Sequence, residues 1–137
     1  MKKKSVIQIF LMISILFLQV HSVHAEKSEE PWAKYPDNSQ LDFEDVDSFY
    51  DKYLDEKIYL EYENAKLNIR EKTTFKDINK MKEKADKYGQ SRSGGMGVHP
   101  NRQVYVFVTV SQDEEMKTAV FDAETKRPLN YDGPLEK

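Results

Sequence analysis

The chain has no cysteine among its 137 residues, and it contains only one tryptophan and three histidines. Without cysteine the protein can form neither a disulfide nor a thiolate metal centre. An iron–sulfur cluster held by cysteines is excluded for the same reason. The stability of the protein must therefore come from an ordinary apolar core.

A long apolar run occurs once, near the N-terminus. Three lysines precede the 15-residue stretch 6–20, and His21-Ser22-Val23-His24-Ala25 places small residues at −3 and −1 of a cut after Ala25. This three-part pattern predicts a secretory signal peptide. As a helix, the run would reach only about 22 Å of the ~30 Å membrane core, so we expect cleavage and no stable membrane anchor. A lipoprotein would need a cysteine at the cut, which the chain lacks.

The predicted mature chain has 112 residues, enough for one domain. Loss of the three N-terminal lysines leaves 18 basic against 24 acidic residues, a net charge of −6. Such a balance disfavours nucleic-acid binding. We divide the chain into a signal peptide (1–25), an irregular lead-in (26–38) and a single domain (39–137). Export without disulfides is typical of Gram-positive secreted proteins.

Periodicity within the domain predicts helices first and strands afterwards. Apolar residues recur at three- and four-residue spacing over residues 39–56 and again over residues 74–89. Ser39 is the expected cap of the first helix, Thr74 and Asp77 resemble a capping box for the second, and Gly89 is its expected end. Residues 57–70 fit either two short strands or a helical stripe, of which we favour the helix.

The second half of the domain predicts an antiparallel sheet. Valines alternate with aromatic residues over residues 103–111, so both faces of this strand are apolar. We expect it to be central and covered on both sides, or paired with a second chain. Residues 116–123 predict a second strand and residues 129–131 an edge strand, while the glycines of residues 90–101 predict a flexible loop. The expected fold class is α+β, with one or two helices packed on a small antiparallel sheet.

Residues that carry chemistry are sparse. The predicted mature chain has one histidine, His99, so a zinc site is not expected, and no cofactor is indicated. An EF-hand starting at Asp45 fails, because Phe49 and Tyr50 occupy its fifth and sixth positions. The types needed for a catalytic triad are present in Ser91, Ser93 or Ser111 with His99 and Asp122. No Gly-x-Ser-x-Gly elbow accompanies them, so enzymatic activity is not the expected function.

The two predicted strands carry a family resemblance. Val104-Tyr105-Val106-Phe107-Val108, followed by Thr118-Ala119-Val120-Phe121-Asp122-Ala123-Glu124-Thr125-Lys126, resembles the hairpin of PepSY-like domains, which are small modules of secreted and cell-envelope bacterial proteins. The resemblance covers residues 74–131 and implies a helix packed on an antiparallel sheet, with a binding or peptidase-inhibitory role. Asp122, Ala123 and Thr125 match the closing stretch of the family. Lys126 stands where the family has glycine, so a different turn is expected there.

These observations together predict a secreted, non-enzymatic binding or regulatory module, with a peptidase inhibitor as one form. Two alternatives stay open: a small hydrolase that uses His99, and an envelope protein that self-associates through its doubly apolar strand. The expected partner is a protein or a cell-wall component. The candidate contact residues are Trp32, Arg92, His99, Arg102, Tyr105 and Phe107.

Overall fold

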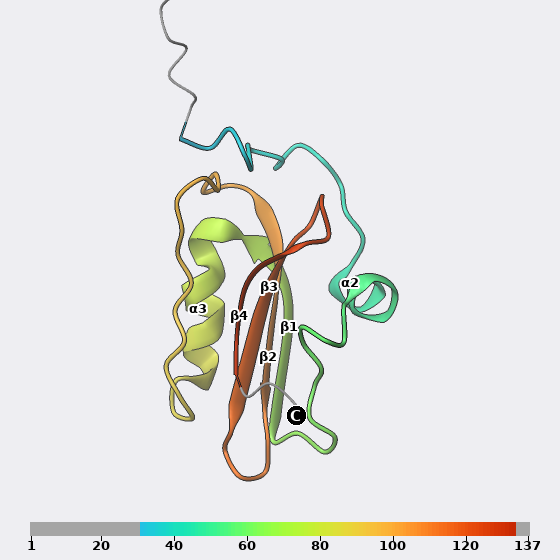
Figure 1. Cartoon of the computed structure of the whole chain (residues 1–137), viewed down its shortest axis with the longest axis vertical. Coiled ribbons are helices and arrows are strands. Elements are labelled where there is room, and N and C mark those ends of the chain that lie inside the picture. The colour runs from blue at the N-terminus through green and yellow to red at the C-terminus, as the bar shows by residue number, and fades with distance from the viewer. Residues whose placement is uncertain (1–30, 134–137) are drawn as a thin grey trace, which may run out of the picture.

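The structure, a computed structural model, describes residues 31–133 and has an α+β fold. Four antiparallel strands form one sheet in the order β1-β2-β3-β4 (Figure 1). The strands are β1 (Leu67–Thr74), β2 (Gln103–Val110), β3 (Met116–Asp122) and β4 (Pro128–Asp132). This arrangement confirms the predicted class. The predicted signal peptide and its cleavage site lie outside the described residues.

Helices cover the two faces of the sheet (Figure 1). Helix α2 (Val46–Tyr53) lies against one face. Helix α3 (Ile78–Lys82), extended by the 3-10 turns η2 (Phe75–Asp77) and η3 (Glu83–Ala85), lies against the other. No helix within residues 31–133 is long and apolar enough to cross a membrane.

Strand β2 is central, as its two apolar faces predict. Its aromatic residues Tyr105 and Phe107 pack under α2 with Phe49, and its first three valines pack under α3 with Ile78 and Val120. Every side chain from Val104 to Val110 is buried. Both edges of β2 are paired, one with β1 and the other with β3, so this strand offers no edge to a second chain.

The predicted start of the first helix needs correction. Helix α2 begins at Val46, because Asp45 and not Ser39 accepts the capping hydrogen bond from the Ser48 N–H (2.9 Å). The carbonyls of Asn38 and Leu41 accept hydrogen bonds from the Gln103 side chain, which holds residues 38–41 against β2. These long-range contacts replace the first turns of the expected helix.

The favoured helix at residues 57–70 is wrong. Residues 54–66 form a loop with a left-handed turn at Asn64 (φ 57°), and β1 then starts at Leu67. Pairing of β1 with β2 along its whole length decides the end of this segment, residues 67–70, since eight register pairs outweigh a weak helical stripe. The helix expected over residues 74–89 is helical only over residues 75–85, and Gly89 lies beyond it.

The predictions for the capping box at Thr74 and for the turn at Lys126 can be compared with the structure. Thr74 Oγ1 donates to Asp77 Oδ2 (2.7 Å), yet neither side chain caps a helical backbone N–H, so the expected capping box is only a side-chain pair. Lys126 adopts φ 62°, the left-handed conformation that glycine takes most readily. A lysine at this position therefore does not prevent a glycine-type turn between β3 and β4.

Candidate functional site

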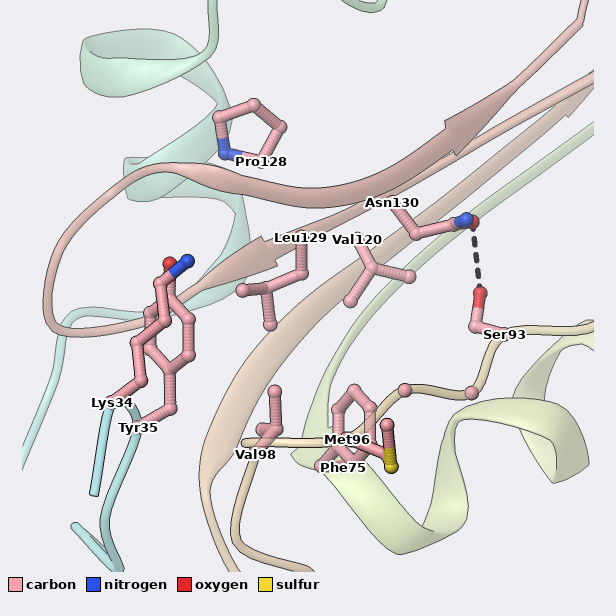
Figure 2. A pocket seen from close by; sticks show the side chains of 12 residues that line it. Lys34, Tyr35, Phe75, Ser93, Met96, Val98, Val120, Pro128, Leu129 and Asn130 are labelled. Atoms are coloured by element: carbon pink, nitrogen blue, oxygen red, sulfur yellow. Dashed lines mark hydrogen bonds between the residues drawn. The ribbon is translucent and has the colours of Figure 1, made fainter. Parts of the chain in front are cut away.

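A crevice of about 240 Å³ lies on the α3 side of the sheet (Figure 2). It lies between the lead-in, the glycine loop and strands β3 and β4. Its lining residues are Lys34, Tyr35, Phe75, Ser93, Gly94, Gly95, Met96, Val98, Val120, Pro128, Leu129 and Asn130. Pockets of drug-sized ligands usually exceed about 300 Å³, so this crevice suits one bulky side chain better than a whole cofactor.

The crevice has an apolar centre and two polar ends. Phe75, Val98 and Leu129 face one another across its middle, as Figure 2 shows. At one end Ser93 Oγ donates a hydrogen bond to Asn130 Oδ1 (2.9 Å). At the opposite end lies Lys34, which pairs with no carboxylate among residues 31–133. The crevice can therefore accept an apolar group that carries a polar or anionic end.

Long-range contacts of the lead-in build one wall of the crevice. Tyr35 forms a parallel bridge with Val98, in which the Tyr35 N–H donates to the Gly97 carbonyl (3.2 Å) and the His99 N–H donates to the Tyr35 carbonyl (2.9 Å). Arg102 Nη1 donates to the carbonyl of Pro36 (2.8 Å). These bonds hold Lys34 and Tyr35 opposite β4.

Lys82 lies directly behind the Ser93 end of the crevice. Its side chain is 2% exposed, and its Nζ donates to Ser93 Oγ (2.7 Å), Ser91 Oγ (3.1 Å) and Thr118 Oγ1 (3.2 Å). No carboxylate within the described part of the chain forms an ion pair with it. Burial lowers the pKa of Lys82 to about 8, because the charged amine loses its hydration. A neutral amine is therefore accessible near physiological pH.

Ser93 is fixed on both sides of its peptide. Its N–H donates to Asn79 Oδ1 (2.8 Å), and its carbonyl accepts from Asn79 Nδ2 (3.0 Å). Helix α3 thus supplies both Asn79 and Lys82, which are one turn apart and hold the glycine loop against the sheet. The start of this loop, at Ser91 and Ser93, is consequently attached to α3 by hydrogen bonds with Asn79 and Lys82.

Two of the candidate contact residues are brought together at the surface. The Trp32 and His99 rings meet edge to face, with centroids 5.0 Å apart, and Trp32 is 39% exposed. Because His99 follows Val98, this aromatic pair adjoins the Tyr35 bridge beside the crevice. Arg92 is exposed and forms a bidentate pair with Asp86 (2.8 and 2.6 Å), which occupies its guanidinium.

The other three candidate contact residues are part of the core, which corrects the prediction that they face a partner. Arg102 is 2% exposed and pairs with Asp122 through two hydrogen bonds (2.6 and 3.0 Å). Tyr105 and Phe107 are fully buried under α2. Helix α2 covers this strand face, so its aromatic residues serve packing and not recognition.

The structure does not assemble the residues that could have formed a triad. Asp122 is occupied by Arg102 and by the Thr125 N–H (2.7 Å). His99 Nδ1 accepts from the Asn101 N–H (3.1 Å) and lies 3.7 Å from Asp37. Neither residue hydrogen-bonds a serine hydroxyl of residues 31–133. No group of three or more potential metal ligands occurs within residues 31–133.

Sequence reasoning missed Lys82. A signal was present, since Lys82 lies four residues after Ile78 and three before Ala85, on the apolar stripe of its own helix. A lysine on an apolar stripe indicates a buried amine that needs oxygen partners. No protein-family model, curated protein or solved structure matches the chain. The PepSY-like resemblance accordingly stays a prediction.

Proposed function

We propose that the protein is a secreted binding module that receives the C-terminal end of a peptide in its crevice. The observation that carries this proposal is the apolar centre of the crevice, closed at one end by Lys34, whose Nζ lies over the Tyr35 ring (5.4 Å) and pairs with no carboxylate among residues 31–133. An apolar side chain would occupy the centre, and the terminal carboxylate would lie at Lys34.

The position of the crevice favours a peptide over a small molecule. It lies beside β4, which pairs on one side with β3 and carries no strand on its other side within residues 31–133. A sheet edge of this kind can accept an extended peptide through main-chain hydrogen bonds, while a neighbouring pocket selects one side chain. A concave site also favours a module that receives a peptide over an inhibitor that inserts a loop into a peptidase.

Fluorescence anisotropy with defined peptides tests this proposal. The probe is fluorescein-labelled Gly-Ser-Ala-Ala-Phe with a free C-terminal carboxylate, compared with the same peptide as its C-terminal amide. We expect the acid to bind about 2–5-fold more tightly than the amide, the size of one exposed charge pair. Leu129→Asp should abolish binding of both peptides, because it places a charge in the apolar centre.

Lys34→Gln isolates the role of the cation. We expect it to bring the acid to the affinity of the amide, whereas Lys57→Gln, at an exposed lysine remote in sequence from every lining residue, should change nothing. Failure of the parent protein to bind either peptide would overturn the proposal. Equal affinity for acid and amide would remove the assigned role of Lys34.

A further inference from the structure

We infer that Ser93 is a nucleophile and Lys82 its general base, so that the crevice is an acyl-transfer site of the serine–lysine type. The inference goes beyond binding, although the identity of its natural substrate, a peptide, rests on the proposed function. The geometry that carries it is the short contact between Lys82 Nζ and Ser93 Oγ (2.7 Å) at one end of the crevice.

The amine is oriented as a base must be. Ser91 Oγ and Thr118 Oγ1 both contact Lys82 Nζ and each other (3.2 Å), so the lysine has a fixed direction toward Ser93. A nucleophile, a base within hydrogen-bond reach and a third group that orients the base form the arrangement shared by unrelated acyl-transfer sites. Ser91 and Thr118 are positioning residues in this scheme.

The surroundings of Lys82 allow it to act as a base. Two charged side chains face it: Asp132 from the end of β4 favours the protonated amine, and Arg92 from the loop opposes it. Burial is the larger influence and brings the pKa of Lys82 to about 8. When the pKa of a general base lies near the working pH, a large fraction of the base is neutral and it still binds a proton strongly enough to accept one.

The residues that follow Ser93 can stabilise an oxyanion. Gly94 and Gly95 line the same crevice, and within the described residues neither N–H donates a hydrogen bond. Free backbone N–H groups next to a nucleophile are the usual donors to the oxyanion of a tetrahedral intermediate. No heavy atom lies within 4 Å of a Cβ built on either glycine, so this side of the loop is open to a ligand.

The reaction balances with these groups alone. In the structure Lys82 Nζ donates to Ser93 Oγ and the hydroxyl donates to Asn130 Oδ1, so in the reactive state the neutral amine turns its lone pair to Ser93 and the hydroxyl proton turns from Asn130 to Lys82. Ser93 Oγ then forms a bond to the acyl carbon of a peptide amide or ester, and its proton passes to Lys82 Nζ. The bond from that carbon to the leaving amine or alcohol then breaks, and the leaving group takes the proton from Lys82. Water then attacks the acyl carbon and gives a proton to Lys82, the bond from that carbon to Ser93 Oγ breaks with release of a carboxylic acid, and Lys82 returns the proton to Ser93 Oγ. Ser93 and Lys34 lie at opposite ends of the crevice, so the reacting carbonyl precedes the C-terminal residue.

Diisopropyl fluorophosphate tests the inference, because it reacts with activated serines, releases fluoride and requires no peptide recognition. With the full mature protein we expect one adduct in the intact mass, mapped to Ser93 by tandem mass spectrometry. The labelling rate should rise with pH and level off above a midpoint near the Lys82 pKa of about 8. Ser93→Ala should abolish labelling, and the surface variant Ser39→Ala should not.

Lys82→Met should slow labelling about 100-fold or more, the usual contribution of a general base. Lys80→Met, on the exposed side of the same helix, is the matched control and should leave the rate unchanged. The pH profile of the parent protein decides the matter even if Lys82→Met fails to fold. An unlabelled Ser93, or labelling without the titration near pH 8, would overturn the inference. Peptide binding by Ser93→Ala, measured separately, tells failure of catalysis from failure of binding.

Discussion

At the scale of single residues, Tyr59 is exceptional because its hydroxyl is buried without a hydrogen-bond partner. The side chain extends from the loop that follows α2, is 3% exposed and packs with Phe107. A buried hydroxyl that has lost water and gained no partner destabilises the folded state. Burial also raises the pKa of Tyr59, since ionisation in this position is strongly disfavoured.

Tyr59→Phe should stabilise the protein by about 1 kcal/mol, because it removes the unpaired hydroxyl and keeps the ring. Urea denaturation gives the free energy of unfolding for this comparison. Tyr105→Phe is the matched control, as the Tyr105 hydroxyl donates to the Glu44 carbonyl (2.7 Å). That variant should lose about 1 kcal/mol, so opposite signs are expected. A loss of stability in Tyr59→Phe would show that its hydroxyl has a partner in solution.

At the scale of elements, the lead-in is attached to the sheet through buried polar groups. The Gln103 N–H donates to Asn38 Oδ1 (2.7 Å), and Arg102 connects Pro36 to Asp122 at the end of β3. Burial by itself would raise the pKa of Asp122, but hydrogen bonds from Arg102 and from the Thr125 N–H outweigh burial and lower it. The ion pair thus stabilises the charged carboxylate.

Asp122→Asn should destabilise the protein by about 3 kcal/mol at pH 7, because it leaves a buried guanidinium with less compensation. The folded-state pKa of Asp122 lies below the unfolded value, so its contribution is complete above the unfolded pKa. It declines as the pH falls through the folded pKa. The difference in free energy of unfolding between the two proteins, measured by urea between pH 7 and pH 3, should therefore narrow toward the acidic end.

The exposed pair of Arg92 and Asp86 provides the control for this measurement. Asp86→Asn should change stability much less, since solvent screens exposed charges. If the gap between Asp122→Asn and the parent protein stayed constant from pH 7 to pH 3, the carboxylate would not be the group responsible.

At the scale of the whole molecule, β2 joins two half-cores. The aromatic cluster under α2 and the aliphatic cluster under α3 share this strand, whose alternating side chains enter both. Loss of either half-core would expose the apolar face that it covers, so neither is expected to persist alone. Small domains of this size usually unfold in one cooperative step.

Val106→Ala tests this coupling, because Val106 belongs to the aliphatic cluster only. We expect a loss of about 2 kcal/mol from the deleted methyl groups and the cavity. The urea midpoints from near-UV circular dichroism, which reports the aromatic cluster, and from far-UV circular dichroism, which reports the sheet, should fall together. Separate midpoints would mean that the half-cores unfold independently.

The parts of the fold that could be predicted from the sequence are those that follow from the pattern of residues within one segment. The alternation of valines with Tyr105 and Phe107 is a property of the strand itself, so its central place and its two covered faces were correctly predicted, as was the α+β class. The apolar stripe with Ile78 and Ala85 likewise placed the second helix against the core. Residues 67–70 were misjudged because pairing with β2, and not the period of the segment, decides their conformation.

The candidate site was largely hidden from such reasoning. Trp32 and His99 were selected as candidate contact residues, and their rings meet at the surface. The other candidates Arg102, Tyr105 and Phe107 were expected to contact a partner, but they are buried inside the protein. The crevice combines residues from separate segments of the chain, and no spacing rule connects Lys34 with Ser93 or Asn130.

The sequence by itself determined that an apolar core must hold this protein together, because the chain contains no cysteine. The alternation within β2 determined what that core would contain. Only the tertiary structure decided that Lys82 is buried among three hydroxyls, that Arg102 pairs with Asp122, and that the lead-in closes a crevice. The physical reason is that burial and charge pairing depend on which distant segments meet, whereas periodicity reports only on the segment that carries it.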